Sequence, residues 1–148
     1  MNANAVHQPL WARTHATQQK PLLLSVSTDS SGNPLLGLEQ DIANPDQRYP
    51  QEQWLNDYLD LGLEEAANAG NKGLKPLQES WLIRLYATLR SAAVCPAAPQ
   101  SWRQLCFDYL YQPFFALQDM YQQSPVNRTK LYSLRREFAA LERILQCD

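Results

Sequence analysis

The chain has 148 residues, of which 45% are hydrophobic and 19% are charged, and its formal net charge is −2. This length and this hydrophobic fraction are typical of one globular domain and exclude a globally disordered chain. A net charge this small gives no reason by itself to expect a nucleic-acid or membrane partner.

The charges are unevenly distributed along the sequence. Residues 1–70 contain three basic and nine acidic side chains, whereas residues 71–148 contain ten basic and six acidic ones. The first part therefore has a net charge of −6 and the second part a net charge of +4. The simpler interpretation is that the two parts pack together and their charges complement each other. The alternative is a basic surface that binds an acidic partner.

The cysteines and the N-terminal residues indicate a soluble, cytoplasmic protein. Cys95, Cys106 and Cys147 form no pattern typical of a disulfide framework, and we expect them to be reduced. Residues 1–10 lack the basic and apolar parts of a secretory signal. No hydrophobic run approaches the roughly 20 residues that a membrane-spanning helix requires, so we expect no membrane partner.

The N-terminal part of the sequence predicts a flexible arm followed by a β-hairpin. Residues 1–20 are polar and show no hydrophobic period, which is typical of a flexible segment. Residues 22–27 alternate with a period of two, residues 29–33 are turn formers, and hydrophobic residues resume at Leu35, Leu36 and Leu38. We therefore predict a hairpin over residues 22–38, within a single domain of residues 21–148.

Four segments after residue 50 have the three- and four-residue spacing of hydrophobic residues that is typical of amphipathic helices. The first ends at the turn-forming residues 70–73, which accept the backbone conformation that closes a helix. The second lies between Pro76 and Cys95. Pro113 is expected to break or kink the third helix.

The fourth helical segment is the most regular. Its hydrophobic residues recur at alternating spacings of three and four for two heptads: Leu131, Leu134, Phe138, Leu141 and Leu145. A pattern this short is more typical of an ordinary core helix than of a coiled coil, although it leaves open a homo-oligomer formed through this C-terminal helix. The predicted fold is mainly α, an antiparallel bundle of four to five helices with a small N-terminal β-hairpin.

The sequence contains no recognisable catalytic or metal-binding pattern, and we expect no cofactor. The two histidines, His7 and His15, both lie in the predicted arm and do not have the spacing of a metal site. The cysteines have no CxxC spacing and no neighbouring histidine to lower a thiol pKa. We therefore expect a protein that acts by binding, without excluding an enzyme whose catalytic residues are dispersed along the chain.

Aromatic residues crowd around Pro113, and basic residues line the last helix. A kinked helix cannot bury aromatic side chains on all its sides, so some of them are candidates for contact with a partner. The predicted partner-binding residues are Tyr111, Phe114, Phe115, Arg135 and Arg136. From them we predict a non-enzymatic protein-interaction module, such as a subunit, adaptor, chaperone or inhibitor, that binds another protein.

Two other kinds of binding stay open. A pocket between helices, lined by Trp81, Tyr86 and Tyr109, would make the chain a small-ligand-binding regulatory domain. Arg135 and Arg136 could instead contact nucleic acid. The isoelectric point of about 5.7 and the low density of basic residues make this the less favoured interpretation.

Overall fold

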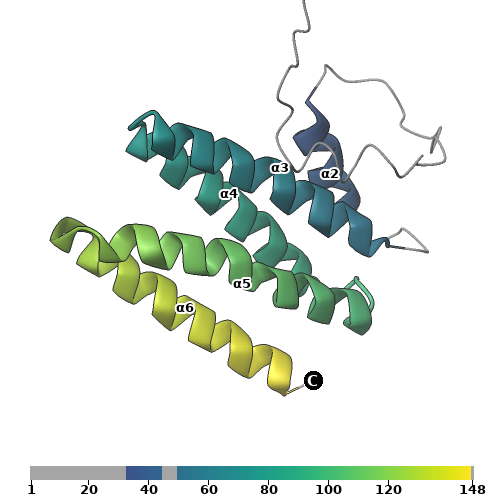
Figure 1. Cartoon of the computed structure of the whole chain (residues 1–148). Coiled ribbons are helices and arrows are strands. Elements are labelled where there is room, and N and C mark those ends of the chain that lie inside the picture. Colours follow the sequence, from purple (N-terminus) through teal and green to yellow (C-terminus); the bar gives the residue numbers. More distant parts are fainter. Residues whose placement is uncertain (1–32, 45–49, 148) are drawn as a thin grey trace, which may run out of the picture. The chain divides into compact units, whose positions relative to one another are not determined.

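The computed structural model describes residues 33–44 and 50–147, all within one compact unit of the chain. These residues form five α-helices and one short 3₁₀ helix (Figure 1). The elements are α2 (Pro34–Ala43), α3 (Glu52–Asn71), α4 (Lys75–Ala93), α5 (Gln100–Gln122), η1 (Pro125–Asn127) and α6 (Arg128–Gln146). The prediction of a mainly α fold is confirmed. The predicted arm at residues 1–20 and the domain boundary at residue 21 lie outside the described residues.

Helices α3 and α4 form an antiparallel hairpin because a glycine closes α3. Gly73 has a φ of 73°, a left-handed conformation that glycine adopts without steric cost. Its amide donates to the carbonyl of Gly70 (3.0 Å), and the amide of Leu74 donates to the carbonyl of Ala69 (2.9 Å). These two bonds satisfy carbonyls that the end of a helix would otherwise leave unpaired. The predicted end of the first long helix at residues 70–73 is confirmed.

Helix α5 runs through Pro113 without interruption, so the predicted break at this residue is wrong. A proline inside a helix removes one hydrogen bond, here the one to the carbonyl of Tyr109. The ring of Pro113 is nevertheless buried, and α5 packs on both α4 and α6. These tertiary contacts outweigh the tendency of Pro113 to interrupt a helix, because most of the stability of a helix in a protein comes from packing.

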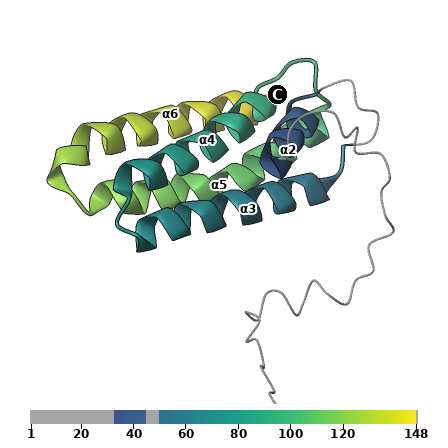
Figure 2. The same cartoon turned by 90° about the horizontal axis from the view of Figure 1, so that it is seen from above.

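The heptad residues of helix α6 pack against the core of the same chain. Leu134, Phe138 and Leu141 are buried, and Leu131 and Leu145 pack against the same core. The helix lies alongside α5 (Figures 1 and 2), and within the described part its backbone does not approach α2 or α3. The interpretation of an ordinary core helix is confirmed, because the heptad seam faces the chain's own core.

Residues 34–43 form helix α2, although the hairpin predicted from the sequence extends to residue 38. The side chain of Asn33 accepts a hydrogen bond from the amide of Leu35 (3.1 Å), and Pro34 occupies the first helical turn. Both are features that start a helix. The strand predicted at Leu35, Leu36 and Leu38 is therefore wrong, whereas the first strand of the hairpin lies outside the described residues.

The hydrophobic residues of α2 follow a helical period rather than a strand period. Leu35, Leu38 and Ile42 recur at spacings of three and four, and all three belong to the core or pack against it. Helix α2 lies against α3 and α4 (Figure 2). Packing on these two helices stabilises a helix of only ten residues, which would be marginal in isolation.

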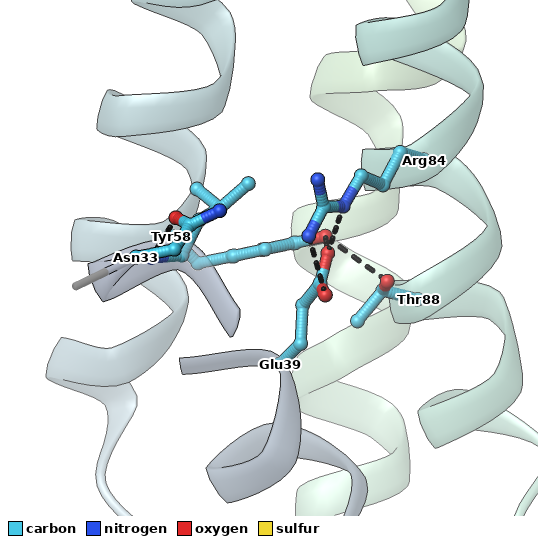
Figure 3. Close-up of polar contacts among 6 residues, drawn as sticks. Asn33, Glu39, Tyr58, Arg84 and Thr88 are labelled. Atoms are coloured by element: carbon cyan, nitrogen blue, oxygen red, sulfur yellow. Dashed lines mark hydrogen bonds and ion pairs between the residues drawn. The ribbon is translucent and has the colours of Figure 1, made fainter. Parts of the chain in front are cut away.

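A polar network also holds α2 on α3 and α4 (Figure 3). Glu39 of α2 accepts two hydrogen bonds from the guanidinium of Arg84, at 2.5 and 2.9 Å, and one from the hydroxyl of Tyr58 at 2.8 Å. The Tyr58 hydroxyl also lies 3.0 Å from Thr88 Oγ1. Burial acts to raise the pKa of Glu39, but the hydrogen bonds from Arg84 and Tyr58 outweigh it and hold the pKa below its usual value. Glu39 and Arg84 thus join the acidic first part of the chain to its basic second part.

Candidate functional site

Two hydrogen bonds define the register between α5 and α6. The hydroxyl of Tyr111 on α5 donates to Glu142 on α6 (2.9 Å), and Arg135 Nε on α6 donates to Gln118 on α5 (3.0 Å). Phe115 lies between Tyr111 and Gln118 along α5, so it is opposite the α6 segment between Arg135 and Glu142. Three of the predicted partner-binding residues, Tyr111, Phe115 and Arg135, are therefore on one side of the α5–α6 pair.

The two predicted phenylalanines have different environments. Phe114 is only 7% exposed and stacks on Phe138 of α6, with ring centroids 4.0 Å apart. Phe115 is 50% exposed, although its ring contacts Phe114 at 5.3 Å and Tyr111 at 6.0 Å between centroids. A partner therefore has access to Phe115 but not to Phe114, which is a core residue and does not belong to the predicted surface.

The charged residues of α6 divide into two sets. One set forms ion pairs with α4, namely Lys130 with Glu79 and Glu137 with Arg90. The other set includes Arg136 and Arg143, which are exposed and have no ion-pair partner among the described residues. Lys130, on the side of α6 that faces α4, therefore forms its ion pair within the fold. Arg136 and Arg143, on the outer side, are available for a partner.

Tyr132, Arg136, Ala139 and Arg143 recur every three or four residues, so they share the outer face of α6. Tyr132 is 68% exposed. Ala139 is half-buried and lies in the α6 segment opposite Phe115, which makes this stripe continuous with the α5 residues. We call the whole surface the aromatic–arginine face: Tyr111, Phe115, Tyr132, Arg135, Arg136 and Arg143.

Tyr132 and Arg143 are not among the partner-binding residues predicted from the sequence. Arg143 is one of several basic residues on the last helix, and Tyr132 stands directly beside the heptad leucine Leu131. The signal that could have found them is a second stripe on α6, at residues 132, 136, 139 and 143, parallel to the hydrophobic seam. The stripe can be identified as the solvent-facing side of α6 only once the hydrophobic seam is known to face the chain's own core.

Carboxylates are interspersed on the same side of the molecule. The hydrogen bond to Glu142 raises the pKa of Tyr111, with smaller contributions from burial and from the charges of Glu142 and Asp108. Asp108 precedes Tyr111 by three residues, Asp119 follows Phe115 by four, and both are exposed. Aromatic residues and arginine are enriched in protein–protein interfaces, and a polar rim is typical of them. The chemistry of the aromatic–arginine face is of this kind.

The three residues predicted to line a ligand pocket lie apart in the structure. Tyr86 is buried, its hydroxyl has no hydrogen-bond partner among the described residues, and burial raises its pKa to about 12. Tyr109 on α5 instead donates to Glu52 of α3 (2.6 Å). Trp81 lines a different hollow, at the N-terminus of α2. The hollow that Trp81 lines therefore includes neither Tyr86 nor Tyr109.

The described residues contain no group of three or more His, Cys, Asp or Glu side chains that could hold a metal ion. All three cysteines are free thiols. Burial raises the pKa of the Cys106 thiol to about 12, so this thiol is protonated at neutral pH. In the same part of the chain, no helix combines the length and the hydrophobicity needed to cross a membrane. The two histidines lie outside the described residues.

Comparison with known proteins found no matching family model, no similar curated protein and no similar solved structure. The surface of the chain itself is therefore the basis on which a function can be proposed.

Proposed function

We propose that this chain is a non-enzymatic protein-interaction module that acts in the cytoplasm and binds another protein through its aromatic–arginine face. The partner is a protein segment that presents hydrophobic side chains together with acidic ones. Three free cysteines fit a reducing compartment.

One observation carries this proposal. A half-exposed phenylalanine and a largely exposed tyrosine, Phe115 and Tyr132, share a surface with two arginines, Arg136 and Arg143, that have no ion pair within the described part of the chain. Exposed aromatic side chains leave hydrophobic area in contact with water, and covering that area with a partner is favourable. Aromatic residues and arginine are also the types that contribute most to binding at protein interfaces.

Charge supports a partner with carboxylates. Among the described residues, no carboxylate forms an ion pair with Arg136 or Arg143, and one turn of helix separates Arg136 from the exposed ring of Tyr132. An acidic partner residue would pair with either guanidinium without displacing an existing bond, because neither of these two arginines has an ion pair among the described residues. Such pairs contribute mainly to association rate and specificity.

A protein partner is favoured over nucleic acid, the other class that an arginine face could bind. Asp108, Asp119 and Glu142 stand among the aromatic and basic residues, and their carboxylates repel phosphates. A nucleic-acid surface would need a denser basic stripe to neutralise several phosphates at once.

The experiment compares partner capture by three forms of the full chain. Three tagged forms are expressed in cells of the organism that makes this protein. They are the wild type, a Phe115→Ser/Arg136→Glu variant and a control variant, Leu74→Ser/Lys72→Glu. The control alters an exposed hydrophobic residue and an exposed lysine at the α3–α4 turn, neither of which belongs to the aromatic–arginine face. Quantitative mass spectrometry of the bound material identifies candidate partners, and circular dichroism checks that each form is folded.

Each candidate is then purified and titrated into the three forms by calorimetry. We expect a direct complex with wild type and with the control, and an affinity at least about tenfold lower for Phe115→Ser/Arg136→Glu, as for the loss of an interface hot spot. Equal affinity of all three forms for every purified candidate would refute the proposed surface. Salt-dependent binding of a single-stranded oligonucleotide that requires Arg136 would replace it with the nucleic-acid interpretation.

A further inference from the structure

A second surface, on different helices, has a hollow of about 320 Å³. It opens where the N-terminus of α2 meets α3 and α4, on elements that share no residue with the aromatic–arginine face. Its hydrophobic lining comes from three helices: Pro34 and Leu35 of α2, Leu61 of α3 and Trp81 of α4. This volume is at the lower end of the range for ligand sites, and the hollow is open to solvent, so it suits one or two side chains of a larger partner.

The lining of this hollow is hydrophobic area that the fold leaves unburied. Leu61 is exposed and the ring of Trp81 is only half-buried, whereas Leu35 is buried at the base. A partner side chain that entered the hollow would remove hydrophobic surface of both molecules from water. A concave site also surrounds such a side chain more fully than a flat patch does.

The charge around the hollow is negative. Glu64 and Glu65 of α3 line it, both are exposed, and neither has an ion-pair partner among the described residues. Arg84 lies beside the hollow, with its guanidinium 5.4 Å from the centre of the Trp81 ring. Glu39 binds that guanidinium with both carboxylate oxygens (Figure 3), so Arg84 is already neutralised. The two carboxylates of α3 are therefore uncompensated.

We propose that this hollow is a second docking site, which binds a segment of another protein that carries a hydrophobic side chain next to lysine or arginine. The hydrophobic side chain occupies the space between Leu61 and Trp81, and the cation pairs with Glu64 or Glu65. The complementary charge selects against the acidic segment that the aromatic–arginine face binds. With two docking surfaces of opposite charge on separate helices, the chain acts as an adaptor that holds two different partners at once.

The test uses defined peptides and the full-length protein labelled with ¹⁵N. The probe is acetyl-Lys-Leu-Phe-Lys-amide, and the two control peptides replace both lysines with glutamate or both hydrophobic residues with serine. Each peptide is added up to millimolar concentration while the indole N–H of Trp81 and the backbone amides are followed by NMR. We expect saturable shifts for the probe that include Trp81 and residues 61–65, and clearly weaker binding of both control peptides.

Two matched variants test the carboxylates. Glu64→Gln/Glu65→Gln removes two charges at the hollow, and Asp108→Asn/Asp119→Asn removes two exposed charges from α5. Each exposed ion pair contributes about 0.2–1 kcal/mol, so we expect the loss of two charges to weaken binding of the probe by between about twofold and thirtyfold. The second variant should leave this affinity unchanged. Equal weakening by both variants, equal binding of the glutamate peptide, or no saturable shift at Trp81 would overturn the proposal.

This test is independent of the function proposed for α5 and α6. The Phe115→Ser/Arg136→Glu variant leaves every residue of the hollow in place and should bind the probe as wild type does. The Leu61→Ser variant removes a hydrophobic side chain from the hollow and should no longer bind the probe peptide. Circular dichroism should show that this variant is still a folded helical protein. If Leu61→Ser is folded and binds the probe with unchanged affinity, the hollow is not the binding site.

Discussion

Phe114 and Phe115 are neighbours in the sequence with opposite roles in the structure. Phe114 stacks on Phe138 within the core, whereas half of the Phe115 side chain is open to solvent. Consecutive residues of a helix point about 100° apart, so one of two adjacent aromatic residues can face a neighbouring helix while the other faces water. Their hydrophobicity is identical, and only the position of α6 distinguishes them.

This difference predicts unequal costs of truncation. Phe114→Ala removes a buried ring and should lower the free energy of unfolding by about 3–5 kcal/mol. Phe115→Ala removes a ring that is already half in water, and we expect a loss of about 1 kcal/mol or less. Urea unfolding followed by circular dichroism measures both values. A cost for Phe115→Ala as large as that for Phe114→Ala would show that both rings belong to the core.

Helices α3 and α4 approach each other closely because α3 has a glycine where α4 has a leucine. A Cβ atom at Gly62 would lie within 3.0 Å of the side chain of Leu85, which is completely buried. Glycine inside a helix costs about 1 kcal/mol relative to alanine, so its presence needs a compensating reason. Close packing of the hairpin provides that reason.

Gly37 of α2 and Gly62 of α3 should therefore respond oppositely to alanine. Gly62→Ala gains helix propensity, but overpacking against Leu85 costs about 1–3 kcal/mol, and we expect a net loss of stability. Gly37→Ala meets no atom within 4 Å and should stabilise the protein by about 0.5–1 kcal/mol. Thermal and urea unfolding of the two variants show directly whether each substitution raises or lowers the free energy of unfolding. A more stable Gly62→Ala protein would mean that Leu85 can move aside.

At the scale of the whole molecule, the uneven charge distribution is only partly compensated within the fold. Glu39 and Arg84 join the acidic first part of the chain to the basic second part. Glu64 and Glu65 on α3 and Arg136 and Arg143 on α6, by contrast, are exposed without ion pairs among the described residues. The simple interpretation of complementary packing thus holds for the α2 network, and these two glutamates and two arginines are open to partners.

The Glu39 network makes the stability of the protein depend on pH. The folded-state pKa of Glu39 is lower than its unfolded-state value of 4.5, so its contribution is fully present above that value and is lost as the pH falls through the folded-state pKa. We expect Glu39→Gln to cost about 1–3 kcal/mol at pH 7, because hydrogen bonds to a charged group are lost. The difference between wild type and variant should shrink as the pH falls below about 4.5.

Urea unfolding of both proteins between neutral and acidic pH measures this difference. Glu64→Gln serves as the control, because its exposed carboxylate has no ion pair among the described residues, and its cost should stay within about 0.5 kcal/mol. A constant difference between wild type and Glu39→Gln across the whole pH range would show that the charge of Glu39 does not stabilise α2.

The sequence by itself determined the features that depend on local periodicity and turn chemistry. The helices α3, α4 and α6, the turn at Gly73 and the core-facing heptad of α6 all follow from spacings within one segment. The tertiary structure decided the rest. It carried α5 through Pro113, buried Phe114, aligned Tyr132 and Arg136 with Phe115, and packed the short helix α2 on α3 and α4. The physical reason is that burial and juxtaposition depend on the positions of other helices, and no periodicity within one segment contains that information.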